Sequence, residues 1–107
     1  MQIIQDIISL FIYERAAHTL FDMGVTISFI AFRIVDFFDI FCALLGESLL
    51  VATLVGKLFL ATRICKRCEL SFESYILKAD LIVLDTANFD IILGMDWFYL
   101  NQVHVNC

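Results

Sequence analysis

The chain has 107 residues, which is enough for one domain with a modest core but too few for two large lobes. Its net charge is −5 at pH 7 and it has no basic block, which argues against a nucleic-acid partner. Hydrophobic residues make up 62% of the chain, but charges interrupt every apolar stretch before it reaches the roughly 20 residues of a membrane-spanning helix. We therefore expect no membrane partner. So apolar a composition instead indicates surface reserved for a partner chain.

The first residues lack the basic segment and the small-residue cleavage site of a secretory signal. We therefore expect a cytoplasmic, intracellular protein.

Most of the chain predicts short strands separated by turns or by one of its few glycines. The expected strands cover residues 7–13, 16–21, 49–55, 57–65, 69–76, 79–84 and 90–94, with a last extended piece at 103–105. The two strands around Gly56 predict a hairpin. The pattern as a whole predicts a mostly β domain, a closed barrel or sandwich with one or two short helices.

Two segments have helical character. Over residues 28–41 the period changes, and Ile30, Ile34, Phe37 and Phe41 fall near one helical face. Ser28 is a candidate N-cap for this helix. Residues 95–100 predict one or two further helical turns.

The four cysteines are Cys42, Cys65, Cys68 and Cys107. Cys65 and Cys68 have the spacing of a zinc knuckle, but a structural zinc site needs four ligands and no second pair is present. Without a secretory signal, reduced thiols are expected. We therefore expect no metal and no cofactor. In a strand, Cys65 and Cys68 would point to opposite faces.

Asp22 is the residue that departs most from this apolar pattern. It ends the run formed by Thr19, Leu20 and Phe21, and Gly24 follows it after one residue. A carboxylate beside a buried strand is costly unless it is hydrogen-bonded or used. Asp-x-Gly is also a common turn sequence, so the tripeptide alone predicts no more than a surface turn.

The segments that surround Asp22 carry longer patterns. Residues 20–30 contain Asp-x-Gly followed by Ser-Phe-Ile. Residues 79–85 form an apolar run that contains two aspartates, and residues 89–97 contain Ile-Ile-Leu-Gly followed by Met-Asp-Trp. Both patterns resemble signatures of retropepsin-like aspartic proteases from gypsy-class retrotransposon polyproteins, and residues 63–68 resemble a segment common in plant members. The order and spacing match over nearly the whole chain. Residues 1–107 are therefore expected to form a single retropepsin-like domain.

The resemblance implies an aspartic endopeptidase that processes a retrotransposon polyprotein as a homodimer. Each protomer would supply one catalytic aspartate, Asp22, in a loop with Gly24 and Thr26. Two carboxylates about 3 Å apart cannot both ionise, so the pair shares a proton and activates a water against the scissile peptide. Only one Asp-x-Gly is present, so activity requires a second copy in any case.

The resemblance also assigns supporting segments. The hairpin around Gly56 corresponds to the flap that covers a polypeptide substrate and excludes water. Ile92, Leu93 and Gly94 correspond to the loop that packs beside the catalytic aspartate. Asp96 is interpreted as a carboxylate at the start of a helix, not as a second catalytic group.

Several positions depart from the family pattern. Met23 stands where the family has Ser or Thr, Val25 replaces a small Ala, and Leu54 occupies a flap position that is often proline. The chain also ends at Cys107, where members often continue into a strand of the dimer sheet, so this interface strand is expected to be absent. These departures support an alternative, a degenerate and inactive retropepsin fold that serves as a dimerisation or peptide-binding module. A ubiquitin-pathway retropepsin-like domain is a third reading, and the second signature argues against it.

Overall fold

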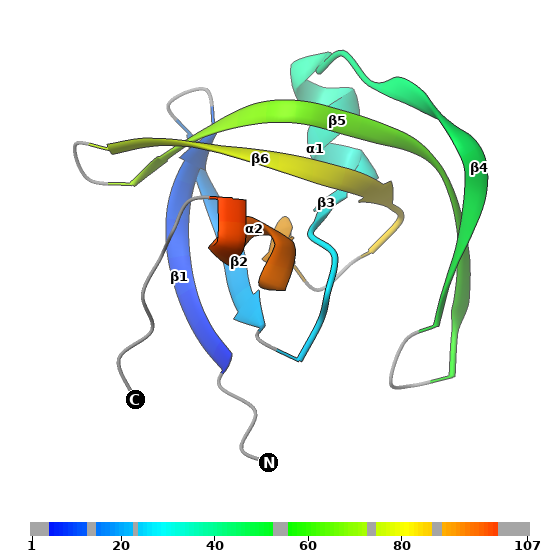
Figure 1. Cartoon of the computed structure of the whole chain (residues 1–107). Helices are drawn as coiled ribbons and strands as arrows, with labels where there is room; N and C mark the ends of the chain where they lie inside the picture. Colours follow the sequence, from blue (N-terminus) through cyan, green and yellow to red (C-terminus); the bar gives the residue numbers. More distant parts are fainter. Residues whose placement is uncertain are drawn as a thin grey trace.

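Seven strands form one mixed sheet that curls until its first strand meets its fifth (Figure 1). The computed structural model describes residues 5–12, 15–22, 24–52, 56–72, 75–86 and 89–100. The elements are β1 (Gln5–Ile12), β2 (Arg15–Asp22), β3 (Phe29–Ala31), α1 (Phe32–Phe38), β4 (Ala43–Ala52), β5 (Leu58–Phe72), β6 (Tyr75–Leu84), β7 (Ile91–Leu93) and α2 (Met95–Leu100). The expected piece at 103–105 lies outside the described residues.

The strand order explains how the sheet closes. The strands lie in the order β1-β2-β7-β3-β6-β5-β4, and pairing of Phe11 with Ser71 joins β1 to β5. Strand β4 extends outside this ring as the hairpin partner of β5, along one side of the molecule (Figure 1). The predicted class, a mostly β closed domain with short helices, is confirmed.

Strand β5 is longer than the sequence predicts. Residues 57–65 and 69–76 were expected as separate strands, but β5 runs unbroken from Leu58 to Phe72. The strand stays continuous because a bulge between Cys65 and Cys68 shifts its register against β6. Arg67, within the bulge, has a left-handed conformation with φ 51°. The Arg67 N–H donates to Asp80 Oδ1 on β6 at 2.9 Å, so the neighbouring strand holds the bulge in place.

The same bulge makes the prediction for the cysteine side chains wrong. An inserted residue shifts the alternation of faces, so two side chains three positions apart can point the same way. Cys65 and Cys68 are 3% and 7% exposed, and both belong to the main core.

The helix prediction over residues 28–41 is also partly wrong. Phe29–Ala31 is β3, which pairs with β6 and β7, and this pairing delays the start of α1 to Phe32. The N-cap is Ala31, not Ser28. The buried face of α1 carries Val35, with Ile34 and Phe38 partly buried beside it, and Phe37 is 67% exposed. The helix ends at Phe38, so Phe41 lies beyond it and is 86% exposed.

The core follows the short central strands. Ile30 and Ala31 on β3 and Ile91 and Leu93 on β7 are fully buried, because these strands have neighbours on both edges and elements above and below. Helices α1 and α2 have seven and six residues, and the described part of the chain contains no helix with the length and apolarity needed to cross a membrane.

A leucine pair tests where the core lies. Leu81 on β6 is 0% exposed and Leu44 on β4 is 77% exposed. Leu81→Ala should lower the free energy of unfolding by about 2–5 kcal/mol, because it removes buried apolar atoms and leaves a cavity. Leu44→Ala should change it by less than about 0.5 kcal/mol. Urea denaturation measures both, and equal losses would contradict this assignment of the core.

Candidate active site

Asp22 is the last residue of β2 and lies beside the end of β7. The two strands are parallel, with Thr19 opposite Ile91 and Phe21 opposite Leu93. One step further along this register, Asp22 lies next to Gly94. The sequence prediction that Asp22 ends a strand beside residues 91–94 agrees with this geometry.

The loop after β2 turns back on the Asp22 carboxylate. The Gly24 N–H donates to Asp22 Oδ1 at 2.9 Å, and the Val25 N–H donates to the Asp22 carbonyl oxygen at 3.2 Å. A backbone donor orients the carboxylate and stabilises its charge. Thr26 is exposed, and its carbonyl oxygen accepts a hydrogen bond from the Asp96 N–H at 3.0 Å. The catalytic-loop role expected for its hydroxyl remains a prediction. Met23 lies outside the described residues.

Gly94 is enclosed by this loop. A Cβ atom at Gly94 would lie 2.7 Å from the Val25 carbonyl oxygen and 2.8 Å from that of Ile27. Real Cβ atoms are essentially never that close to backbone atoms, so the loop packs here because residue 94 has no side chain. The supporting segment expected at Ile92, Leu93 and Gly94 is therefore in direct contact with the loop that carries Asp22.

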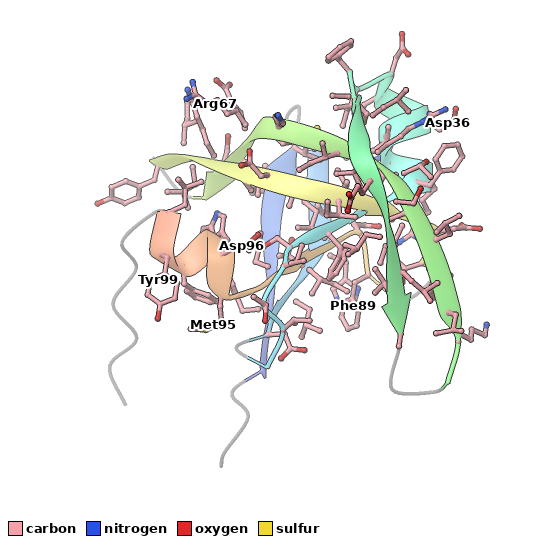
Figure 2. The ribbon with its side chains drawn as sticks, turned by 45° about the vertical axis from the view of Figure 1, so that its right-hand side comes forward. Asp36, Arg67, Phe89, Met95, Asp96 and Tyr99 are labelled. Carbon is pink, nitrogen blue, oxygen red and sulfur yellow. The ribbon has the colours of Figure 1, made fainter. Side chains whose placement is uncertain are left out.

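Ser28 and Asp96 tie the two loops together. The buried Ser28 hydroxyl donates to Asp96 Oδ1 at 2.5 Å and accepts from the Gly94 N–H at 2.9 Å. The Ser28 N–H donates to Asp96 Oδ2 at 3.3 Å. Figure 2 places Asp96 near the middle of the molecule, whereas Arg67 and Asp36 lie at its periphery. Hydrogen bonds to a charged group are stronger than neutral ones, so the bonds between Ser28 and Asp96 contribute strongly to holding the two loops together.

Asp96 also lies in the first turn of α2, as the sequence indicates. Its Oδ1 accepts from the Trp97 N–H at 2.6 Å in the first turn of the helix. Trp97 is 4% exposed, and its ring lies 5.4 Å from that of Phe21 on β2. Trp97 is thus a core residue. The contact between Ser28 and Asp96 was not predicted, because the sequence indicates Ser28 as a helix N-cap.

A second fastening, also missed, joins α1 to the start of β7. Arg33 forms an ion pair with Asp90 at 2.6 Å and donates to the Thr86 carbonyl oxygen. Asp90 Oδ2 also accepts from the His18 N–H at 2.8 Å. In the sequence, Arg33 falls on the polar side of the helix predicted over residues 28–41. An arginine in that position is equally typical of a solvent-exposed side chain, so the sequence did not indicate the ion pair.

An apolar cavity of about 200 Å³ opens beside Asp22. The β4–β5 hairpin contributes Val51, Ala52 and Phe59, and Leu84 and Thr86 contribute from the end of β6 and beyond. The predicted hairpin around Gly56 is present between β4 and β5, and Gly56 has φ 83°, which favours glycine. The hairpin therefore lies over the apolar space that adjoins the carboxylate.

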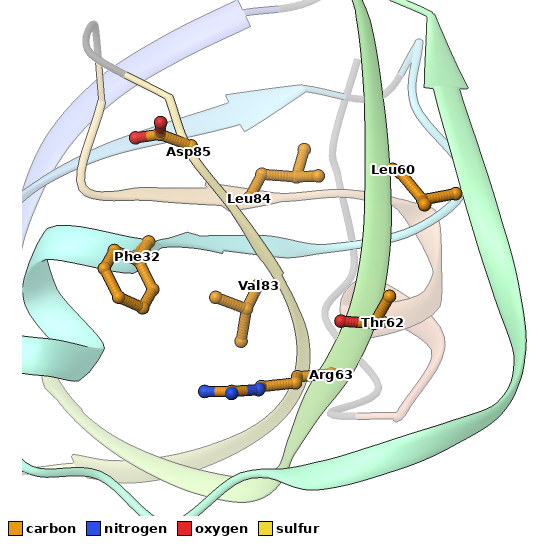
Figure 3. A pocket seen from close by; sticks show the side chains of 7 residues that line it. All are labelled: Phe32, Leu60, Thr62, Arg63, Val83, Leu84 and Asp85. Atoms are coloured by element: carbon orange, nitrogen blue, oxygen red, sulfur yellow. The ribbon is translucent and has the colours of Figure 1, made fainter.

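A neighbouring cavity of about 300 Å³ shares Leu84 with the first (Figure 3). Asp85 and Arg63 lie toward opposite ends of it, with Leu84 and Val83 between them and Phe32 and Leu60 on opposite sides. The first cavity is mostly apolar with Asp22 on its lining, whereas the second has a mixed polar and apolar lining that includes Arg63 and Asp85.

In the described part of the chain, no three His, Cys, Asp or Glu side chains are arranged to hold a metal ion. The site presents a carboxylate at a strand end that accepts a hydrogen bond from the Gly24 N–H and adjoins an apolar cavity.

A closed, mostly β domain with an Asp-x-Gly loop packed on an apolar-apolar-Gly segment is a retropepsin-like fold. The chain belongs to the retroviral aspartyl protease family, whose sequence profile matches residues 2–107. This membership supports a function of the aspartic protease type. No individual curated protein matches the sequence significantly.

Two glycines provide a matched test of the contact at residue 94. Gly94→Ala should lower the free energy of unfolding by about 1–3 kcal/mol, because the new methyl group meets backbone oxygens that cannot move alone. Gly46→Ala on β4, where no atom lies within 4 Å, should leave stability unchanged or raise it slightly. Thermal or urea unfolding checks both. A tolerated Gly94→Ala would mean that the loops do not pack this closely.

Two serines test the fastening between the loops. Ser28→Ala should lower the free energy of unfolding by about 1–3 kcal/mol, because it removes the bond to Asp96 and leaves the buried Gly94 N–H without its acceptor. The exposed Ser48 provides the control, and Ser48→Ala should have little effect. Similar chemical denaturation curves for the two variants would argue against this network.

Proposed function

We propose that this domain is an aspartic endopeptidase that processes a gypsy-class retrotransposon polyprotein as a homodimer. The observation that carries the proposal is the position of Asp22, at the end of β2 in register with Gly94 and open to an apolar cavity under the β4–β5 hairpin. Membership of the retroviral aspartyl protease family supports the same conclusion.

The proposed chemistry needs a second carboxylate. The sequence contains one Asp-x-Gly, and we assign the second aspartate to another copy of the chain. In the pair, the two Asp22 side chains share one proton. One carboxylate takes a proton from a water as the water attacks the scissile carbonyl carbon, and the other donates its proton to the carbonyl oxygen. The pair acts as a unit, so neither role belongs permanently to one protomer.

Gly24 and Gly94 have distinct parts in this proposal. The Gly24 N–H orients one oxygen of Asp22, and the absence of a side chain at Gly94 lets its segment support the loop from behind. Thr26 is proposed as the hydroxyl residue of the same loop. Ile92 lines the cavity beside Asp22, and Leu93 is buried in the main core.

The substrate is proposed to be a polypeptide bound between the hairpin and the Asp22 loop. Val51, Ala52 and Phe59 would contact an apolar side chain next to the scissile bond, since the cavity that they line is mostly apolar. Closure of the hairpin, with Gly56 at its turn, would exclude bulk water from the carboxylates.

The alternative function is an inactive retropepsin fold that binds a peptide or a second copy. It rests on Met23, because a thioether cannot donate the hydrogen bond that Ser or Thr makes at this family position. Val25 carries less weight for this alternative. Its side chain packs against the cluster around Phe29, and its carbonyl oxygen accepts from the Met95 N–H at 2.8 Å. The valine is thus accommodated in the loop.

Cleavage of a peptide substrate at mildly acidic pH tests the proposal. Wild-type protein should show cleavage that pepstatin inhibits, and Asp22→Asn should reduce it at least about 100-fold, because an amide cannot shuttle the proton. Asp36→Asn, an exposed carboxylate on α1, should retain wild-type activity. Asp96→Asn should lose stability but keep cleavage wherever it remains folded, since Asp96 does not line the cavity.

The outcomes separate the two functions. Folded wild-type protein without cleavage, but with dimer formation in sedimentation over a range of concentrations, would favour the binding module. Cleavage that survives Asp22→Asn would contradict the assigned catalytic residue. Equal loss in Asp22→Asn and Asp36→Asn, with folding preserved, would contradict the assigned roles as well.

A further inference from the structure

Three cysteines converge in the core at the base of the β4–β5 hairpin. Cys65 and Cys68 flank the bulge of β5 and are buried, and Cys42, which precedes β4, packs half-buried against the same cluster. All three are free thiols. They do not form the donor arrangement of a metal site, so a metal does not explain their grouping.

The strand register makes Cys42 and Cys65 neighbours across the ladder. Ala43 lies opposite Ile64 and Leu44 opposite Arg63, so the next step places Cys42 opposite Cys65. Residues directly opposite in an antiparallel pair have Cα atoms about 4.5–5.5 Å apart. A disulfide needs a Cα separation of about 4.4–6.8 Å, so this pair is suitable without backbone movement.

Cys65 and Cys68 are less suitable partners. They lie on one strand, and residues three apart in a regular strand are separated by roughly 10 Å between Cα atoms. The bulge between them is held in place by the hydrogen bond from the Arg67 N–H to Asp80, so the intervening backbone has little freedom to bring the two sulfurs together.

The three thiols also influence one another electrostatically, Cys42 with Cys65 and Cys65 with Cys68. The Cys42 Sγ donates a hydrogen bond to the Ile40 carbonyl oxygen at 3.6 Å. Burial raises the pKa of the Cys42 thiol, and the interaction with Cys68 raises the pKa of Cys65. The same interaction lowers the pKa of Cys68. Cys65 is thus the central thiol, and Cys42 is the member with the most access to solvent.

We propose that Cys42 and Cys65 form an oxidation site, at which a hydroperoxide converts the two thiols into a cross-strand disulfide. In the first step, the Cys42 thiol loses its proton and the thiolate sulfur attacks one peroxide oxygen, so the rate should rise with pH toward the raised pKa of Cys42. The O–O bond breaks, Cys42 becomes a sulfenic acid, and the other peroxide oxygen takes up the proton and leaves as an alcohol or water. In the second step, the Cys65 sulfur attacks the sulfenic sulfur, and hydroxide leaves with the thiol proton as water. The two sulfurs lose two electrons in total and the peroxide gains them.

The disulfide would fasten the base of the hairpin whose other end adjoins Asp22. It joins the chain before β4 to the bulge of β5, whereas Val51 and Phe59 pair near the far end and line the cavity. Oxidation would therefore restrict how far β4 can move from β5. The site itself does not depend on protease activity, so its test is independent of the proposed function.

Peptide mapping of the full chain tests the proposal. The protein is reduced, freed of reductant, treated with hydrogen peroxide, blocked with an alkylating reagent and digested with trypsin without reduction. Trypsin cuts after lysine and arginine, so Cys42 falls in residues 34–57, Cys65 in 64–66, Cys68 in 68–78 and Cys107 in 79–107. We expect peptide 34–57 linked to peptide 64–66, with the mass loss of two hydrogen atoms, in several-fold excess over other linked pairs and reversed by dithiothreitol.

Two variants serve as a matched pair. Cys42→Ser should abolish the linked peptide, and Cys68→Ser should preserve it. The proposal is overturned if wild type links 64–66 to 68–78 instead, if Cys107 supplies the partner, or if peroxide modifies the thiols without linking them. Since the wild-type map alone decides between these pairs, a variant that fails to fold does not weaken the test.

Discussion

The hydroxyl of Ser28 is the point on which the candidate site depends. It donates to Asp96 and accepts from the Gly94 N–H, so a single buried group joins the loop after Asp22, the turn after β7 and the first turn of α2. A hydroxyl can fill both roles because it carries one donor and two acceptor positions. Backbone bonds from Met95 and Asp96 to the carbonyl oxygens of Val25 and Thr26 reinforce the same contact. These hydrogen bonds hold the loop that follows Asp22 against residues 94–96, so the two segments can move apart only if the bonds break.

The closed sheet explains why these distant segments meet. Strands β2 and β7 pair in parallel although residues 23–90 separate them in the sequence. The curled strands β5 and β6 bring the chain back to β2. The bulge in β5 contributes to this curl, because an extra residue increases the local bend and twist of a strand. One consequence is the clustering of thiols, since the bulge directs Cys65 and Cys68 to the same side.

The apolar composition is only partly used inside the described part of the domain. The β4–β5 hairpin has Val51 and Phe59 facing the cavity, but Leu50, Leu58 and Leu60 are exposed by 63%, 64% and 66%. Such leucines on alternate positions give the hairpin two apolar faces, whereas a hairpin with one face in water normally has one. Exposed apolar surface of this kind fits contact with another polypeptide, which is consistent with the dimer and substrate proposed for the family member.

The sequence by itself determined the mostly β class, the hairpin around Gly56, and the strand that ends at Asp22, because alternation and glycine positions act locally. The family signatures also indicated that residues 92–94 support Asp22. Only the tertiary structure decided the partner of Ser28, the start of α1 and the orientation of Cys65 and Cys68. Each of these depends on pairing with strands far away in the sequence. Pairing with β6 and β7 makes residues 29–31 a strand despite their helical period, and that choice turns Ser28 away from a helix cap and toward Asp96.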